Sequence, residues 1–321
     1  MVLIHFNVLA KLNYIKGILF GIGSGILIGI QPIIVISLPP EIDAYLFAAM
    51  TVFYETIIFL PLFFLERKRL NSTLRQDPSK LVELNILKNG LKKNKYFLLY
   101  IGINFAIAQI LLYLAYQLSG AINASLAQKT TIIFGLLFGF LINHEKISLT
   151  QIIFSMLLFF GLTLAVTQGN FNLIEFNIGI LIMLLTAAIW MIAHTLTKPI
   201  LERKEITSIQ LVFIRNLLNS IILISTYFIF FPIQNIKLIF DPLSQIYFII
   251  MGFAYSFDLF FWYKAISYIN VSTATIIVAP SPIITALFAT LFLGEEFTIF
   301  HFFGTIIIII SILVIVKEKG K

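Results

Sequence analysis

Long apolar runs separated by short polar segments dominate this chain. An α-helix rises ~1.5 Å per residue, so a run of roughly 20 apolar residues is long enough to cross the hydrocarbon of a bilayer. Ten runs approach or reach this length. They cover residues 15–38, 43–65, 96–118, 120–142, 148–167, 177–197, 206–230, 245–266, 271–292 and 298–316. The pattern predicts an all-α membrane protein with ten transmembrane helices.

The basic residues between these runs fall on one side of the predicted membrane. If the helices are threaded from a cytoplasmic N-terminus, about 18 of the 22 Lys and Arg residues face the cytoplasm, and only Lys237 lies clearly outside. The strongest marker is the basic cytoplasmic loop 66–95, for which two interpretations stay open, a solvated linker or an amphipathic helix on the membrane surface. The positive-inside rule therefore places this segment, the N-terminal residues 1–14 and the C-terminal residues 317–321 in the cytoplasm. It also predicts that the protein lies in the inner membrane of the cell.

Composition supports this class and excludes several others. With 60% hydrophobic and 12% charged residues, the chain is too apolar for a water-exposed surface. The net charge of +7 does not indicate nucleic-acid binding, because the basic residues flank apolar spans where anionic lipid headgroups are the nearer partner. Zero cysteines and four scattered histidines give no metal-ligand spacing, and no phosphate-binding glycine loop is present. We expect no metal, no cofactor and no direct use of ATP.

An internal repeat appears when the chain is shifted by 150 residues. Each copy holds five predicted helices, 15–167 in the first repeat and 168–316 in the second, and an odd number of helices inverts the second copy. The repeat predicts a substrate site near the midplane, around which the two halves rock to give alternating access. The matched pairs are Ala115 with Ala265, Ala124 with Ala274, Leu137 with Leu287, Phe138 with Phe288, Leu141 with Leu291 and Glu145 with Glu295.

The second repeat resembles the EamA-like drug/metabolite transporter superfamily. The resemblance rests on Ala265, Ala274, the Ala-Pro-Ser-Pro run 279–282 and the Leu-Phe-Leu-Gly-Glu run 291–295. The first repeat is similar to it more faintly, with Asn123-Ala124-Ser125 and Glu145 kept but Lys129-Thr130 in place of Ala279-Pro280. The resemblance implies a ten-helix carrier that mostly exports amino acids, metabolites or drugs. It also implies that the first, third and fourth helices of each half line the cavity.

Four ionisable residues lie inside the predicted helices, about 12–20 Å from the cytoplasmic ends at ~1.5 Å per residue. They are Glu55, Lys129, Arg215 and Asp258. Two interpretations stay open, because these acids and bases could neutralise one another as buried pairs or face a solute. In the second, Lys129 would hold a carboxylate or phosphate, while Asp258 or Glu55 would bind a substrate amine or a coupling proton. The resemblance places Glu55 and Arg215 nearer the periphery, which favours a structural role for both.

Other side chains on the helices expected to line the cavity are also candidates. Pro280 and Pro282 should kink the ninth helix and free carbonyl groups toward the interior, because proline lacks an N–H group. His194 lies one turn from the cytoplasm, where an interfacial role is expected. Polar and aromatic candidates are Gln31, Asn104, Gln109, Tyr113, Gln128, Thr130, Trp190, Tyr255 and Tyr263.

The first helix carries glycine at every fourth position from 17 to 29, namely Gly17, Gly21, Gly25 and Gly29. A stripe of this kind lets another helix approach backbone to backbone. We expect close packing here. Sliding between two states is the alternative use of such a surface.

Together these patterns predict a secondary transporter of small organic solutes. The resemblance implies that it is an exporter of metabolites such as amino acids or related zwitterionic or charged solutes, and the residues themselves leave the direction open. Its partners would be the solute, membrane lipid and a coupling proton, and it would be a monomer or a homodimer. A channel or facilitator is the first alternative, although no filter motif is present. An intramembrane enzyme is the second, although Asp258 and His194 lie on different helices without an evident nucleophile.

Overall fold

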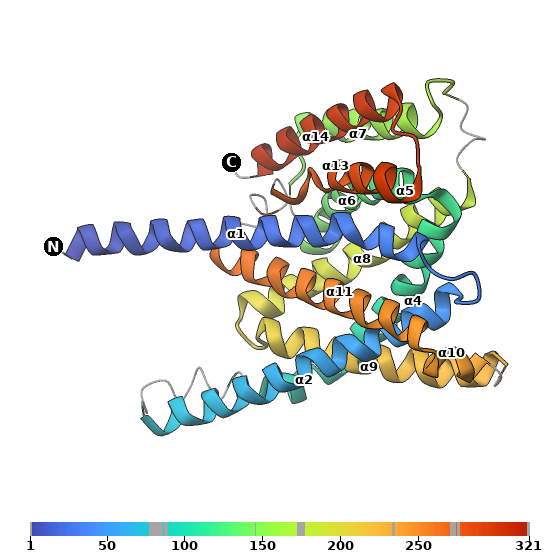
Figure 1. Ribbon diagram of the computed structural model, residues 1–321. Helices are drawn as coiled ribbons and strands as arrows, with labels where there is room; N and C mark the ends of the chain where they lie inside the picture. Colours follow the sequence, from blue (N-terminus) through green and yellow to red (C-terminus); the bar gives the residue numbers. More distant parts are fainter. Residues whose placement is uncertain are drawn as a thin grey trace. The chain divides into compact units, whose positions relative to one another are not determined.

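A computed structural model describes residues 2–76, 86, 89–144, 146–171, 177–232, 235–269, 274 and 277–319, and this part of the chain is helical (Figure 1). Within it, nine helices are long and apolar enough to cross a membrane. Their spans are Tyr14–Ile36, Ala44–Ser72, Lys95–Ser119, Ala121–Ile142, Leu149–Val166, Ile178–Leu201, Ser208–Phe230, Pro242–Ile266 and Ile299–Lys317. The protein is therefore a multi-pass membrane protein.

The predicted ninth span, 271–292, is described only in part. Its second half is a shorter apolar helix, Ser281–Leu293, made of α13 (Ser281–Phe288) and the π-helical η4 (Ala289–Leu293). Much of its first half, like Glu145 in the first repeat, lies outside the described residues. The count of ten helices and the cytoplasmic termini stay predictions.

Several helices extend beyond the apolar runs that predicted them. The clearest case is α2 (Ala44–Gln76), which continues into the segment 66–95 that was expected to be a loop. Residues 66–76 contain no glycine or proline and several good helix formers, so nothing local stops the helix where the hydropathy falls. Other helices, not all of which extend in this way, are α1 (Val2–Ile36), α4 (Lys95–Ser119), α7 (Leu149–Val166), α8 (Ile178–Glu202), α9 (Ser208–Phe230), α10 (Ile236–Phe240), α11 (Pro242–Tyr268) and α14 (Ile299–Lys319).

The chain forms two compact units that do not coincide with the two sequence repeats. Unit 1 contains Met1–Ser37, Leu114–Ala188 and Phe257–Lys321, and unit 2 contains Leu38–Tyr113 and Ile189–Ser256. The boundary falls inside α4, α8 and α11. Each unit therefore draws helices from both halves of the sequence.

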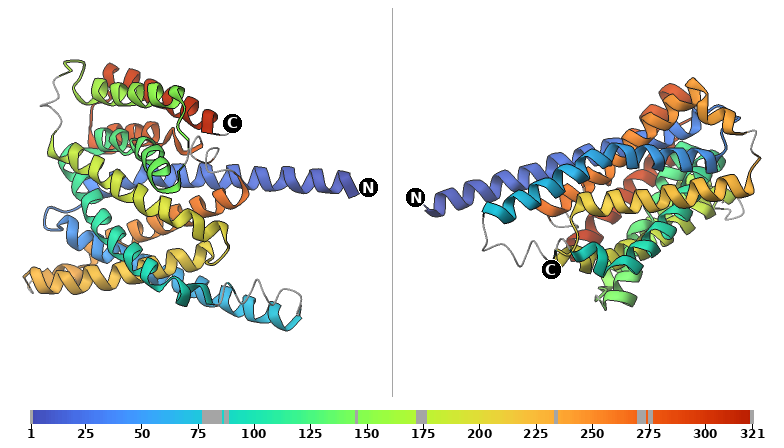
Figure 2. Two further views of the ribbon diagram at one scale, coloured as in Figure 1. Left: turned by 180° about the vertical axis from the view of Figure 1, so that it is seen from behind. Right: turned by 90° about the horizontal axis from the view of Figure 1, so that it is seen from below.

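In unit 1, α7 and α14 lie side by side (Figure 1; Figure 2). At one end Gln151 donates from Nε2 to the carbonyl of Ile315 at 3.2 Å, and at the other Thr298 donates from Oγ1 to Gln168 at 2.6 Å. The two helices are therefore antiparallel. A β-carbon on Gly304 would lie 2.6 Å from the carbonyl oxygen of Gly161, so glycine is what permits this close backbone approach.

In unit 2, α2 and α9 form the corresponding pair (Figure 1). Tyr45 is hydrogen-bonded to Thr226 near one end, and the rings of Phe63 and Phe213 stack with centroids 4.5 Å apart farther along. These contacts also make the pair antiparallel. Thus the second helices of the two repeats, like the fifth helices in unit 1, run in opposite directions, which is what an inverted duplication requires.

The fifth helices also begin in the same way. Ser148 and Gln151 form a capping box at the start of α7, in which each side chain bonds the backbone of the other. At the start of α14, 150 residues later, the Thr298 amide donates to Nδ1 of His301 at 3.2 Å, and the His301 amide donates to the Thr298 hydroxyl at 3.3 Å. Histidine here takes the part that glutamine plays in the first repeat.

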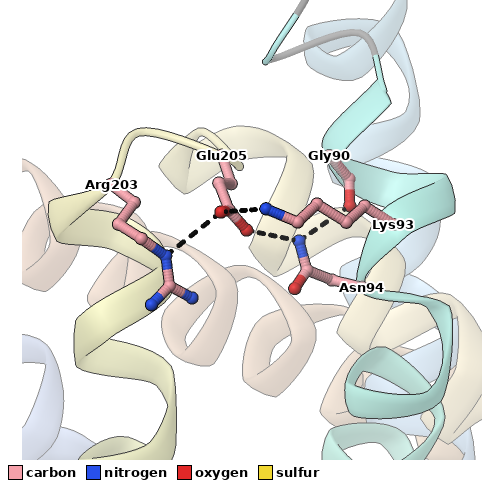
Figure 3. A network of polar contacts seen from close by, with 5 residues as sticks. All are labelled: Gly90, Lys93, Asn94, Arg203 and Glu205. Atoms are coloured by element: carbon pink, nitrogen blue, oxygen red, sulfur yellow. Dashed lines mark hydrogen bonds and ion pairs between the residues drawn. The ribbon is translucent and has the colours of Figure 1, made fainter.

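The connection between α8 and α9 is held by a polar network around Glu205 in unit 2 (Figure 3). Its carboxylate accepts from Lys93 Nζ at 2.6 Å, from Asn94 Nδ2 at 2.9 Å and from Arg203 Nε at 3.1 Å. The Glu205 side chain is 4% exposed, whereas Lys93 and Arg203 are largely exposed. The end of the predicted basic segment 66–95 is thereby joined to the segment that precedes α9.

Candidate functional site

Two equivalent helices are broken at the same position of the repeat. The predicted span 120–142 consists of α5 (Ala121–Gln128) and α6 (Thr131–Asn143), joined by a turn at Lys129-Thr130. Backbone bonds from Lys129 to Leu126 and from Thr130 to Ala127 span three residues, tighter than in an α-helix. In the second repeat the turn is at Ala279-Pro280, 150 residues later. The kink expected at Pro280 is seen as a turn, and the predicted span 120–142 is present but interrupted by a turn at Lys129-Thr130 that its hydropathy did not indicate.

Lys129 lies at the first of these breaks and reaches the second. Its side chain is buried, and Nζ donates to Ser281 Oγ at 2.7 Å and to the carbonyl of Val278 at 3.4 Å. An α-helix would satisfy the Val278 carbonyl through the N–H of residue 282, but that residue is Pro282 and has no N–H to donate. The proline of one repeat therefore leaves an acceptor for the lysine of the other.

Asp258 on α11 is buried in the same unit and is held from α1. Ser24 donates from Oγ to Oδ1 at 2.6 Å, and Gln31 donates from Nε2 to Oδ2 at 3.1 Å. Ser24 and Gln31 are seven residues apart, so they lie on one face of α1. Asp258 also lies within electrostatic range of Lys129.

We call this group, made of Ser24, Gln31, Lys129, Asp258 and Ser281, the Lys129–Asp258 site. All of its members belong to unit 1. Opposite charges at short range reduce the cost of burying each one. Chemically, an ammonium donor can hold a carboxylate or phosphate, and a carboxylate can hold an amine, so the pair matches a zwitterion or a charged solute.

The glycine-bearing face of α1 closes against α13 beside this site. Thr285 donates from Oγ1 to the carbonyl of Gly29 at 2.9 Å. A β-carbon on Gly29 would lie 2.7 Å from Cβ of Ile284, whereas one on Gly25 would meet its nearest neighbour, Val278, at 3.4 Å. The close packing expected of the stripe is present, and Gly29 is a point of close approach to α13.

A second buried polar cluster lies in unit 2. Gln109 donates from Nε2 to Glu55 at 3.1 Å and to the Tyr113 hydroxyl at 2.9 Å. Asn219 donates from Nδ2 to Gln109 at 3.5 Å, and Tyr255 lies within electrostatic range of Tyr113. These residues join α2, α4, α9 and α11 through side chains buried in the unit.

The predicted substrate-binding residues therefore divide between the two units. Lys129, Thr130, Asp258, Gln31 and Pro280 belong to unit 1, whereas Gln109, Tyr113, Trp190 and Tyr255 belong to unit 2. The Thr130 hydroxyl donates to the carbonyl of Ala127 at the end of α5, and Pro280 is exposed. Trp190 packs against Ile101, Phe105 and Ala193, and His194 places its ring edge-on to Phe105.

Sequence reasoning gave no role in the site to three residues whose contacts support it. Ser24 could have been found from its spacing to Gln31, and Ser281 from its place between Pro280 and Pro282. The third is Glu295, whose carboxylate accepts from the backbone amides of Ala121 at 2.7 Å and Ile122 at 3.0 Å. A carboxylate is favourable at a helix N-terminus, so Glu295 fixes the start of α5, the helix that leads to Lys129.

Comparisons with known proteins agree with this architecture. A family model described as the EamA-like transporter family matches residues 15–167 and 177–317. Among 28 solved chains that match, one crystal structure covers 94% of this chain and 98% of its own, with a TM-score of 0.58 and 13% sequence identity. That likeness shows the fold alone. No curated protein matches.

Proposed function

Because the chain belongs to the EamA-like transporter family, whose members are membrane transporters of small solutes, we propose that it is a secondary carrier with its binding site at Lys129 and Asp258. The proposed solutes are amino acids or related zwitterionic or charged metabolites. Export across the inner membrane is the proposed direction. The proton gradient is the proposed source of energy, with Asp258 or Glu55 as the group that takes up the proton.

The observation that carries this proposal is the pair of buried charges in unit 1. An ionisable group in hydrocarbon costs several kcal/mol, so it is retained where it does something that an apolar side chain cannot. Lys129 is held by a hydroxyl and a carbonyl, and Asp258 accepts from a hydroxyl and an amide. These neutral partners can be exchanged for the carboxylate and the amine of a solute without leaving a new charge unpaired.

The broken helices support alternating access. A turn at Lys129-Thr130 and another at Ala279-Pro280 divide equivalent helices at equivalent points, and α5 and α13 run antiparallel between the contacts of Glu295 and Lys129. Discontinuous helices at the repeat interface are a recurring feature of carriers that alternate between two openings. In our proposal, solute binding at Lys129 and Asp258 couples the movements of the two broken helices.

Flux in proteoliposomes tests the proposal. The purified protein should catalyse counterflow of labelled amino acids that saturates with concentration and is accelerated by unlabelled solute on the other side. A carrier requires both behaviours, because each solute must be bound and released in turn. Linear flux without counterflow would instead indicate a channel, and chemical conversion of the solute without flux would indicate an enzyme.

A further inference from the structure

Arg215 on α9 is a buried cation whose hydrogen bonds are incomplete. Its side chain is 1% exposed, and its Nε and Nη2 both donate to Oδ1 of Asn216, at 3.1 Å and 3.0 Å. Its Nη1 has no hydrogen-bond acceptor among the described residues. Nor does any carboxylate in that part of the chain lie within ion-pair distance of the guanidinium. The charge is therefore buried without a counter-charge from described residues.

Several other buried polar atoms in unit 2 also lack a hydrogen-bond partner among the described residues, and two of the donors belong to the surroundings of Arg215. Nδ2 of Asn216 and Nε1 of Trp190 are buried and also lack an acceptor in the described part. The Phe105 ring connects the group, since the Arg215 guanidinium lies 4.3 Å above its centroid and Trp190 packs against the cluster that contains it. The edge-on ring of His194 contacts the same phenyl group.

The energetics favour an anion as the missing partner. A buried donor without an acceptor costs about 1–3 kcal/mol, and a buried unpaired cation costs more. The three groups named above are donors, so a cationic ligand would not relieve them and a neutral acceptor would supply no counter-charge. An oxyanion supplies several acceptor lone pairs and the missing negative charge at once.

We propose that Arg215, Asn216 and Trp190 form an oxyanion-binding site, the Arg215 site, which takes the carboxylate or phosphate of a small solute. Arg215 lies seven residues beyond Ser208, the start of α9, which is about 10 Å along the helix. The charge pattern places that end of α9 on the cytoplasmic side. The Arg215 site shares no residue with the Lys129–Asp258 site, and its binding of an anion does not require that the protein transport amino acids.

The fluorescence of Trp190 provides a direct reporter. The chain contains two tryptophans, so Trp262→Phe leaves Trp190 alone, and the full-length variant can be placed in phosphatidylcholine nanodiscs. Titration with sodium acetate or inorganic phosphate, at constant ionic strength set by sodium chloride, should change the Trp190 emission in a saturable way. Methylammonium chloride should give no change.

Two variants made in this background test the assignment. Arg215→Gln should weaken acetate binding about ten-fold or more, as expected for loss of a charge-assisted hydrogen bond. Asn216→Asp is nearly isosteric and places a permanent carboxylate against the guanidinium. It should therefore abolish the response in a folded protein whose thermal stability is equal to or above that of the parent. An unchanged acetate titration in Asn216→Asp would overturn the proposal.

A third variant and a lipid control separate this site from other sources of the signal. Lys129→Gln should leave the acetate response intact. If Lys129→Gln removes the response and Arg215→Gln does not, the anion binds at the Lys129–Asp258 site, which overturns the Arg215 site and leaves the proposed transport function standing. A response that appears with phosphatidylglycerol in the nanodisc but not with acetate or phosphate would assign Arg215 to a lipid phosphate and overturn its role in solute binding.

Discussion

The ammonium group of Lys129 lies 2.7 Å from the hydroxyl of Ser281, and the two residues come from the breaks of equivalent helices in the two repeats. This single hydrogen bond joins the two points at which the inverted duplication departs from regular helix. It also places a positive charge within electrostatic range of Asp258.

Lys129→Glu should abolish transport of a zwitterionic or anionic solute, because the reversed charge repels the carboxylate and lies near Asp258. Lys129→Arg should keep part of the flux, since the positive charge remains. Counterflow in proteoliposomes measures both variants. Lys237→Glu makes the same charge change at an exposed position on α10 and should transport normally. Full flux in Lys129→Glu would contradict the assigned role.

Asp258→Asn should raise the KM for solutes that carry an amine by about ten-fold or more, because a charge-assisted contact to the amine is lost. Ser24→Ala should cause a smaller increase, since it removes one donor to the carboxylate but leaves the charge. Competition by an amino acid and by its deaminated analogue provides the measurement. Equal losses for the two competitors would show that Asp258 does not recognise the amine.

Gly29→Ala should lower the thermal stability of the protein and slow transport, because its new methyl group would overlap Cβ of Ile284 on α13. Overpacking of this kind typically costs about 1–3 kcal/mol. Gly25→Ala is the matched control, one turn earlier in the same helix, where the nearest neighbour is at 3.4 Å. Thermal unfolding in detergent should separate the two variants. Equal effects would mean that helix propensity, not contact with α13, governs this face.

Glu295→Gln should destabilise the protein by about 1 kcal/mol, the usual scale for loss of a helix cap and of a favourable charge at a helix N-terminus. The amides of Ala121 and Ile122 donate to different oxygens of the carboxylate, and the substitution turns one of these oxygens into an NH2 group that faces a donor. Glu296→Gln changes the adjacent exposed carboxylate and should be neutral. Thermal unfolding of both proteins, measured side by side, gives the comparison.

Stability should depend on pH through Glu205. Its hydrogen bonds with Lys93 and Asn94 lower the pKa of this carboxyl to about 2 from an ordinary value of 4.5. Because the folded-state pKa is the lower one, the contribution is complete above pH 4.5 and is lost as the pH falls toward 2. Glu205→Gln should therefore melt several degrees below the parent at neutral pH, and the difference should shrink below pH 4.5. A difference that stays constant down to pH 3 would show that the ionised carboxylate contributes nothing.

Hydropathy was sufficient to place most helices, because a membrane span is determined by the length of an apolar run. The C-terminal end of α2 was predicted less accurately, since the helix continues to Gln76 after the apolar residues stop. Backbone hydrogen bonds persist in water where no glycine or proline interrupts them, so hydropathy alone could not locate this end.

The charged residues of the candidate site could be predicted from the sequence, but their hydrogen-bond partners could not. Lys129 and Asp258 stood out because charge inside a span is rare. The contact between Lys129 and Ser281 joins residues 152 positions apart, and no local spacing reveals it. The turn at Lys129-Thr130 was missed because neither residue breaks a helix by itself. The available signal was that Lys129-Thr130 occupies the same repeat position as Ala279-Pro280. Using it would have meant transferring the break expected at the proline to the first repeat, which has no proline there.

The interleaving of the two units has a consequence for how the protein is made. Asp258 and its donor Ser24 are 234 residues apart, and unit 1 takes segments from the start, the middle and the end of the chain. During synthesis, Ser24 and Lys129 enter the membrane long before Asp258 and Ser281 exist. Until the later helices are inserted, the polar side chains of the early helices must therefore form hydrogen bonds with other partners. A protein shortened before residue 257 would be left with a lysine and no completed site, which makes it a natural target for membrane quality control.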